Sequence, residues 1–204
     1  MALETGLRGN NFFMKIHLIR HSKTYGNTLN RYIGRTDEPL CKEGIELLKS
    51  RTYPNVQKVF VSPMIRCIET ADIIYKDVDR KVVQGLEECD FGDFENKNYI
   101  ELNGNEDYQK WIDSNGTMPF PGGEDLRYFK FRCIGAFEKV IYDSLNEGYS
   151  EIAFVVHGGT IMSIMEKYAH PHKSYYKWQI KNGEFISTSL NEGEWNKGNK
   201  KLYY

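Results

Sequence analysis

The chain has 204 residues, which is the size of one domain or of one domain with a small insertion. Its 27 lysines and arginines nearly balance its 28 aspartates and glutamates, so the formal net charge is −1. This balance excludes the broadly basic surface of a general nucleic-acid-binding protein. Hydrophobic residues make up 40% of the chain and aromatic residues 14%, which excludes wholesale disorder.

Signals for membrane insertion and export are missing from the sequence. One of the longest apolar runs covers only residues 152–156, far below the roughly 18 residues that span a bilayer. The N-terminus lacks the apolar region of a secretory signal peptide. The four cysteines are scattered without a CxxC pair, which is typical of reduced, packed thiols. We therefore expect a cytoplasmic protein without a membrane or nucleic-acid partner.

Residues 1–13 show no periodicity and precede a second methionine, Met14. We interpret them as a leader or extension, and we expect a single domain at 14–204. Within that domain, the chain after Leu86 is irregular, acidic and aromatic, with short helical pieces. We place a small cap-like insertion at about 95–122.

Buried strands and helices alternate along the domain. Short apolar and β-branched runs predict strands at residues 14–19, 59–61, 81–83, 152–156 and 185–190. Apolar periodicity and boundary signals predict helices at 43–50, 63–75, 124–145 and from 160 to before 171. Ser62 and Pro63 read as the N-cap and first residue of the second helix. This order predicts an α/β fold, a three-layer sandwich whose mainly parallel sheet carries helices on both faces.

Basic side chains follow several of these strands. Arg20 and His21 end the first strand, His157 follows the most apolar strand, and Arg66 lies on the first turn of the second helix. Strand C-termini and helix N-termini share one edge of an open α/β sheet, and ligands bind at that edge. The sequence therefore predicts that these four side chains converge.

Such a cluster suits a compact dianion. Arginine grips phosphate oxygens in a bidentate manner, and backbone N–H groups at helix starts add to the binding. Gly158 and Gly159 allow close approach of the backbone. A phosphoryl group fits this description better than a carboxylate does.

A histidine in a phosphate pocket can also react. Neutral imidazole is a nucleophile that can accept the phosphoryl group and form a phosphohistidine. A general acid must then protonate the leaving alkoxide and later deprotonate the attacking water. The acidic segment after Leu86 supplies the candidates Glu87, Glu88, Asp90, Asp93 and Glu95.

Several blocks of this sequence follow a known order of motifs. Residues 20–27 match R-H-G-x-[TS]-x-x-N, residues 31–40 match R-x-x-G-x-x-D-x-P-L, and residues 62–71 match S-P-L-x-R-[AC]-x-[EQ]-T-A, with departures noted below. Residues 86–95 match L-x-E-x-x-x-G-x-[WF]-E, and residues 121–124 and 156–159 complete the order. The chain thus resembles the histidine phosphatase superfamily, the phosphoglycerate-mutase-like enzymes, over about 14–190.

The resemblance implies a role for each matching residue. His21 would be the phosphorylated nucleophile, and Glu88, which is four residues before Gly92 in its block, would be the general acid rather than Glu87. The phosphoryl group would be bound by Arg20, Arg66 and His157, with Asn27 lining the same pocket. Gly158, Ser62 and Gly34 are further candidates for substrate binding. The resemblance implies no cofactor and no metal.

One departure from the motif concerns the residue after the nucleophile. Ser22 stands where the family usually has glycine, so its Cβ would crowd the pocket or its hydroxyl would donate to a phosphoryl oxygen. Lys23 adds a positive charge nearby. Ser22 keeps open a second hypothesis, that the protein is a phosphate-binding pseudo-enzyme.

The substrate is less constrained by the sequence than the chemistry is. We expect a small phosphorylated metabolite, because no block of paired arginines, as found in phosphoglycerate mutases, lies between Glu95 and Pro121. Several runs look most like α-ribazole-5′-phosphate phosphatases of cobalamin synthesis. A broad-specificity metabolite or sugar phosphatase and a mutase-type enzyme remain alternatives, and a monomer and a homodimer both remain open. Aromatic residues of the cap form either a wall for the leaving group or ordinary packing: Tyr99, Tyr108, Trp111 and Phe120.

Overall fold

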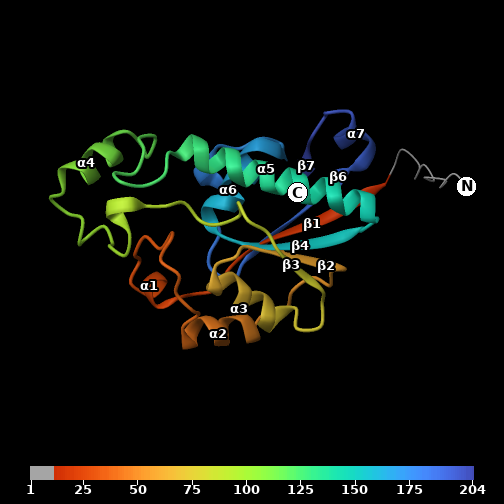
Figure 1. Ribbon diagram of the computed structural model, residues 1–204, viewed down its shortest axis with the longest axis horizontal. Helices are drawn as coiled ribbons and strands as arrows, with labels where there is room; N and C mark the ends of the chain where they lie inside the picture. Colours follow the sequence, from red (N-terminus) through yellow and green to blue (C-terminus); the bar gives the residue numbers. More distant parts are fainter. Residues whose placement is uncertain (1–11) are drawn as a thin grey trace, which may run out of the picture.

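The computed structural model describes residues 12–204 and shows a mixed sheet flanked by helices (Figure 1). Strand β1 (Phe13–Arg20) lies beside β4 (Glu151–Val156), and both run parallel to β2 (Lys58–Val61) and β3 (Arg80–Val82) in the order β3-β2-β4-β1. On the other side of β1, the order continues with β6 (Phe185–Asn191), β7 (Leu202–Tyr203) and β5 (Ala169–His170). The pairings of β6 with β1 and with β7 are antiparallel.

Helices cover both faces of this sheet (Figure 1). On one face lie α5 (Leu126–Glu147), α6 (Gly158–Tyr168) and α7 (Glu192–Asn196), whose apolar residues share one core cluster with the sheet. On the other face, α3 (Ile65–Ile74) packs on the sheet through Cys67 and Ala71, and α2 (Lys42–Lys49) packs beside α3. The predicted α/β sandwich is confirmed, and the two-residue strands β5 and β7 are too short for a sequence pattern to reveal.

The start of the domain differs from the prediction. Phe13 already pairs with Asn191 in the sheet, and Phe12 packs against the main core cluster, because the strand continues upstream of Met14. Folded structure thus begins before residue 14. The rest of the predicted leader, residues 1–11, lies outside the described residues.

The start of α3 is also different from the sequence prediction. The N-cap is Met64, which makes no side-chain capping bond, and the helix begins at Ile65. The Ile65 N–H instead donates to the carboxylate of Asp37, 2.8 Å away, from a loop far away in the sequence. Ser62 is therefore not a helix cap, and its hydroxyl is free to serve the site described below.

A cap lies beyond the carboxyl ends of the parallel strands (Figure 1). It contains η1 (Gly92–Phe94) and α4 (Glu106–Asp113), and it is joined to the first turn of α5 by a third apolar cluster. The short helix η2 (Tyr175–Trp178) contacts the cap, since Tyr176 lies against Gly116, and the short helix α1 (Tyr25–Thr28) follows β1 in the chain. The aromatic rings of the cap pack on one another, edge to face in Phe94 with Tyr108 at a centroid distance of 5.3 Å and stacked in Tyr108 with Trp111 at 6.1 Å.

Candidate active site

The ends of β1 and β4 bring the two site histidines together. The register pairs Arg20 with Val156, and the His21 N–H donates to the Val156 carbonyl oxygen at 2.9 Å. The residue that follows β4 is His157, and the two imidazole rings lie 5.1 Å apart between centroids. Parallel pairing therefore fixes both rings at one sheet edge.

His21 has a defined tautomer. Its Nδ1 lies 2.7 Å from the Ser22 carbonyl oxygen, and a carbonyl can only accept, so we assign the proton to Nδ1. Burial, then the charges of Arg66 and Arg20, lower the pKa of His21 well below its usual value. The neutral imidazole thus has a free electron pair on Nε2, and the ring lines the cavity although only 3% of the residue is exposed.

Two arginines hold unpaired donors next to this histidine. Arg66 is fully buried and donates to the carbonyl oxygens of Gly34 at 2.8 Å and Thr36 at 2.9 Å. Arg20 donates to the Ile180 carbonyl at 2.7 Å. In both guanidinium groups the Nε atom is buried without a hydrogen-bond partner among the described residues. Leaving a buried charged donor unsatisfied is costly, so these groups fit a site that an anion completes.

His157 is held from behind by α3 and the end of β2. Its Nε2 lies 2.8 Å from the Ser62 hydroxyl and 3.5 Å from the Cys67 sulfur. Burial, then the charge of Arg66, lower the pKa of His157 well below its usual value, so this ring is neutral as well. Ser62 therefore orients His157 and is fully buried.

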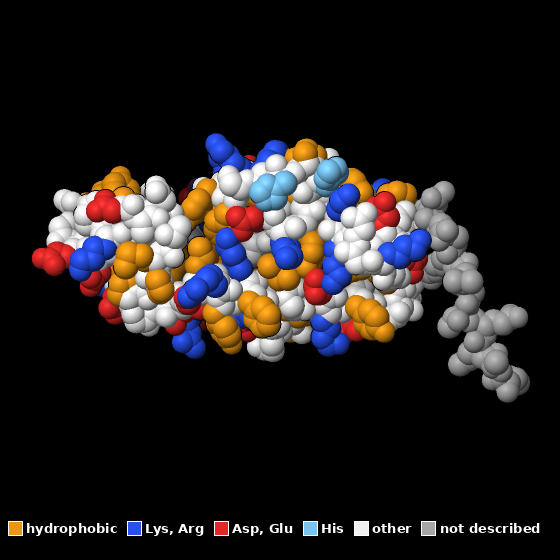
Figure 2. All heavy atoms as spheres, turned by 90° about the horizontal axis from the view of Figure 1, so that it is seen from above, with side chains coloured by type: hydrophobic (Ala, Val, Ile, Leu, Met, Phe, Trp, Pro, Cys, Tyr) orange, Lys and Arg blue, Asp and Glu red, His pale blue; other side chains and the backbone are white. Residues whose placement is uncertain are grey.

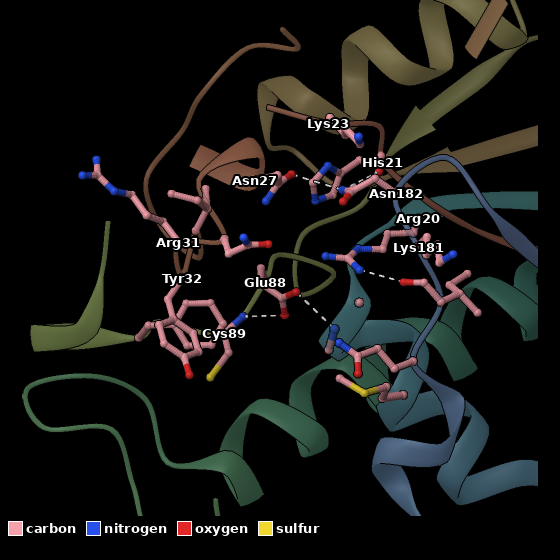
Figure 3. Close-up of a pocket in the computed structure, with 18 of the residues that line it drawn as sticks. Arg20, His21, Lys23, Asn27, Arg31, Tyr32, Glu88, Cys89, Lys181 and Asn182 are labelled. Atoms are coloured by element: carbon pink, nitrogen blue, oxygen red, sulfur yellow. Dashed lines mark hydrogen bonds between the residues drawn. The ribbon is translucent and has the colours of Figure 1, made fainter. Parts of the chain in front are cut away.

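The two adjacent glutamates face different surroundings. The Glu88 carboxylate lines the cavity and accepts hydrogen bonds from the N–H groups of Cys89 at 3.0 Å and Gly159 at 3.1 Å (Figure 3). The Glu87 carboxylate turns back to the Gly85 N–H. A Cβ at Gly159 would lie 2.3 Å from Glu88 Oε1, so this close approach requires glycine.

These groups surround one cavity with a volume of about 1180 Å³, many times the size of a phosphate. Figure 3 shows Arg20 and His21 from the end of β1, Asn27 from α1 and Glu88 from the segment after β3 projecting into it. Gly158 also lines it, whereas Arg66, His157 and Ser62 are fully buried behind the wall. The structure thus brings together the residues predicted from the three strand ends and from the acidic segment.

Ser22 and Gly34 are placed differently from the expectation. The Ser22 hydroxyl is fully buried and donates to the Gly44 carbonyl oxygen at 2.7 Å, while its N–H donates to Thr70 Oγ1 at 3.0 Å. Ser22 therefore ties the loop to α2 and α3, and its side chain neither crowds the cavity nor contacts a ligand there. Gly34 acts through its carbonyl, which accepts from Arg66, and it does not line the cavity.

Sequence reasoning missed the residues between η2 and β6. Asn182 donates to the carbonyl oxygen of His21 and to Oδ1 of Asn27, each at 3.1 Å, and so joins two parts of the site. Lys181 also lines the cavity (Figure 3). The one available signal was the turn dipeptide Asn182-Gly183 just before the last predicted strand.

Within residues 12–204, no group of three or more His, Cys, Asp or Glu side chains is arranged to hold a metal ion. No helix in the same range is long and apolar enough to cross a membrane.

Known proteins similar to this chain are phosphatases and mutases. It is 28% identical over 169 residues to a broad-specificity phosphatase of Saccharomyces cerevisiae, covering 76% of this chain and 70% of the relative. It is 32% identical over 189 residues to a 2,3-bisphosphoglycerate-dependent phosphoglycerate mutase of Bifidobacterium longum, covering 74% and 76%.

Solved structures with the same fold include a putative α-ribazole-5′-P phosphatase from Escherichia coli K-12. The TM-score is 0.75 at 23% identity, covering 88% of this chain and 92% of that one. The pattern of the Histidine phosphatase superfamily (branch 1) matches residues 16–199, nearly the whole described chain. The chain belongs to the histidine phosphatase superfamily.

Proposed function

We propose that this protein is a metal-independent phosphomonoesterase that works through a phosphohistidine on His21. The observation that carries the proposal is the neutral imidazole of His21, fixed by its Nδ1 proton beside two arginines whose buried Nε groups lack partners. This arrangement supplies a nucleophile and positive charge for the equatorial phosphoryl oxygens.

In the first step, His21 Nε2 attacks phosphorus and the bond to the ester oxygen breaks. Glu88, in its protonated form, gives its proton to the departing alkoxide. Arg20 binds the phosphoryl oxygens from the cavity wall, and Arg66 and His157 bind them from the buried side of His21. The N–H groups at the start of α6 add to the positive field. The alcohol leaves, and the phosphoryl group is on His21.

In the second step, water replaces the histidine. The Glu88 carboxylate takes a proton from the water, whose oxygen attacks phosphorus while the P–N bond breaks. Phosphate is released, His21 is again neutral, and Glu88 is again protonated. The position of Ser22 supports an enzyme over a pseudo-enzyme, since its side chain is tied to Gly44 and leaves the pocket open.

For the substrate, we propose an alkyl phosphate ester whose leaving alcohol carries an aromatic ring system, with α-ribazole 5′-phosphate as the first candidate. We call the part of the cavity lined by Arg20 and His21, where we propose that the phosphate binds, the phosphate end. Beyond it, the cavity has a wall of aromatic side chains: Tyr32, Phe91, Trp111, Phe120, Tyr175 and Tyr176. Rings of this kind stack on a flat base and favour it over a small polar alcohol. Of the four aromatic residues predicted for this wall, Trp111 and Phe120 line the cavity, Tyr108 packs behind them, and Tyr99 is exposed.

Hydrolysis of an aryl phosphate tests the reaction class. We expect turnover by the wild-type protein, no turnover by His21→Ala, and unchanged turnover with a chelator present. Rapid quenching with labelled substrate should trap the label on His21. Loss of activity with the chelator would overturn the metal-independent mechanism, and vanadate binding without turnover would indicate the pseudo-enzyme.

A screen of phosphorylated metabolites tests the substrate. It includes α-ribazole phosphate, sugar phosphates and, for the mutase alternative, 3-phosphoglycerate with 2,3-bisphosphoglycerate. We expect the highest kcat/KM for α-ribazole phosphate. Phosphate exchange between glycerate positions faster than hydrolysis would favour a mutase.

A further inference from the structure

Arg132 on α5 uses its whole guanidinium to hold the segment that carries Glu88. Its Nη1 donates to the carbonyl oxygens of Gly85 at 3.2 Å and Glu87 at 2.9 Å. Its Nη2 donates to the carbonyl of Glu88 at 2.9 Å, and Nε and Nη2 together hold the carboxylate of Glu124 at 2.7 and 2.8 Å. All five N–H donors of an arginine thus have partners, three of them backbone oxygens of the Glu88 segment.

Glu124 holds the same segment through the backbone of Asp90, two residues after Glu88. Its N–H donates to the Asp90 carbonyl at 2.9 Å, and its Oε2 accepts from the Asp90 N–H at 3.4 Å. Both charged side chains of the pair are mostly shielded, with 19% of Arg132 and 10% of Glu124 exposed. A buried, bidentate pair of this kind has a single geometry, unlike a surface ion pair.

The two backbone segments joined by this pair touch directly. A Cβ at Gly92 would lie 2.1 Å from the Pro121 carbonyl oxygen, and a Cβ at Gly123 would lie 2.5 Å from the Asp90 carbonyl oxygen. The Asp93 N–H donates to Pro121 at 2.8 Å. The residues 121–124 therefore form the base of the cap, where the chain returns from it, pressed against the segment that carries Glu88.

We propose that Arg132 and Glu124 are positioning residues for Glu88. They fix the backbone on both sides of Glu88, so that one carboxylate can first protonate the leaving oxygen and then deprotonate water at the same place. This inference rests on the proposed function, because it assigns a purpose to Glu88 as acid and base. Neither side chain lines the cavity, so neither is a catalytic residue.

Glu124→Gln tests the proposal through its dependence on the leaving group. The variant keeps the shape of the side chain but gives up the carboxylate that holds Arg132. Proton donation matters for an alkoxide and little for a nitrophenolate, which leaves without a proton. We expect kcat/KM to fall roughly 30-fold or more for glycerol or ribose phosphate and less than about threefold for p-nitrophenyl phosphate, within the range of general acid catalysis.

The same series separates positioning from general damage. Glu138→Gln is the matched control, since Glu138 is likewise an ion-paired glutamate, located on α5, and its partner Lys200 lies away from the cavity. It should leave both kcat/KM values within about twofold of wild type. Vanadate inhibition should be unchanged in Glu124→Gln, because Arg20, His21 and Arg66 are untouched. Arg132→Lys, which keeps the charge but cannot hold three carbonyls and a carboxylate, should reproduce the effect.

A double variant gives the decisive comparison. If Glu124 acts through Glu88, then Glu88→Gln/Glu124→Gln should be no slower than Glu88→Gln alone on the alkyl substrates. Equal losses on alkyl and aryl substrates, or additive losses in the double variant, would overturn the proposal. No hydrolysis of p-nitrophenyl phosphate by the wild type would instead overturn the proposed function.

Discussion

The phosphate end of the cavity and the cap are built in different ways. At the phosphate end, His21, His157 and Arg66 are buried, and each extends from a strand end or from the helix that follows one. In the cap, α4 has no buried residue, and Tyr99 is largely exposed. Backbone hydrogen bonds between the parallel strands β1 and β4 fix the phosphate end of the cavity. The cap is held mostly by contacts between aromatic rings.

This difference between the two regions assigns the proposed reaction to one and substrate selectivity to the other. The register of paired strands cannot shift by less than a residue, so His21, Arg20 and Arg66 have one arrangement. Ring packing tolerates exchanges of side chains with small losses. We infer that the strand ends determine the reaction, and that the cap determines which alcohol fits above it.

The largest expected effect is at the nucleophile. Replacing His21 with alanine removes the only acceptor for the phosphoryl group in the proposed reaction, so kcat should fall by at least about 10⁴-fold. The measurement is hydrolysis of p-nitrophenyl phosphate in steady state. His170→Ala, at an exposed position in β5, is the control and should keep full activity. A His21 variant with more than a few per cent of wild-type activity would contradict a phosphohistidine.

Arg66→Lys should have the next largest effect. Lysine keeps the charge but cannot hold the Gly34 and Thr36 carbonyls and still present a donor to phosphate. We expect kcat/KM to fall roughly 10²-fold and vanadate inhibition to weaken in parallel. Arg35→Lys, on a side chain that is 76% exposed, should change neither by more than about twofold. Equal effects of the two variants would contradict a buried phosphate site.

The two buried histidines should make stability depend on pH. Their pKa values are lowered in the folded protein, chiefly by burial, so the unfolded chain binds more protons as the pH falls below about 6.5. The free energy of unfolding should therefore decrease as the pH falls through this range. Urea titrations at several pH values measure it. His157→Gln should decrease less steeply, and an unchanged slope would contradict a neutral, buried His157.

The smallest expected effect is at the aromatic wall. Tyr176 lines the cavity, is 53% exposed, and lies against Gly116 of the cap. Tyr176→Ala should raise KM about tenfold for esters whose alcohol carries an aromatic base and leave KM for glycerol phosphate unchanged. Tyr142→Ala, at an exposed position of α5, is the control. An equal change for both substrates would remove the aromatic wall from the explanation of selectivity.

The sequence by itself determined which basic side chains lie at the site edge of the sheet. Arg20, His21 and His157 follow buried strands, and parallel strands deliver their carboxyl ends to one edge whatever the loops do. The apolar pattern of each strand was enough to place these residues at the edge. The α/β sandwich predicted from the alternation of strands and helices is confirmed. The same reasoning fails for strands of two residues and for a helix start capped from a distant loop.

Only the tertiary structure decided where the polar side chains point. Glu87 and Glu88 are adjacent, and Glu88 faces the cavity because Arg132 and the Gly159 N–H, both distant in sequence, hold its segment. Ser22 turns to Gly44, and Ser62 turns to His157 rather than capping a helix. The direction of a side chain is selected by the partners that satisfy its hydrogen bonds, and these partners meet only when the chain is folded.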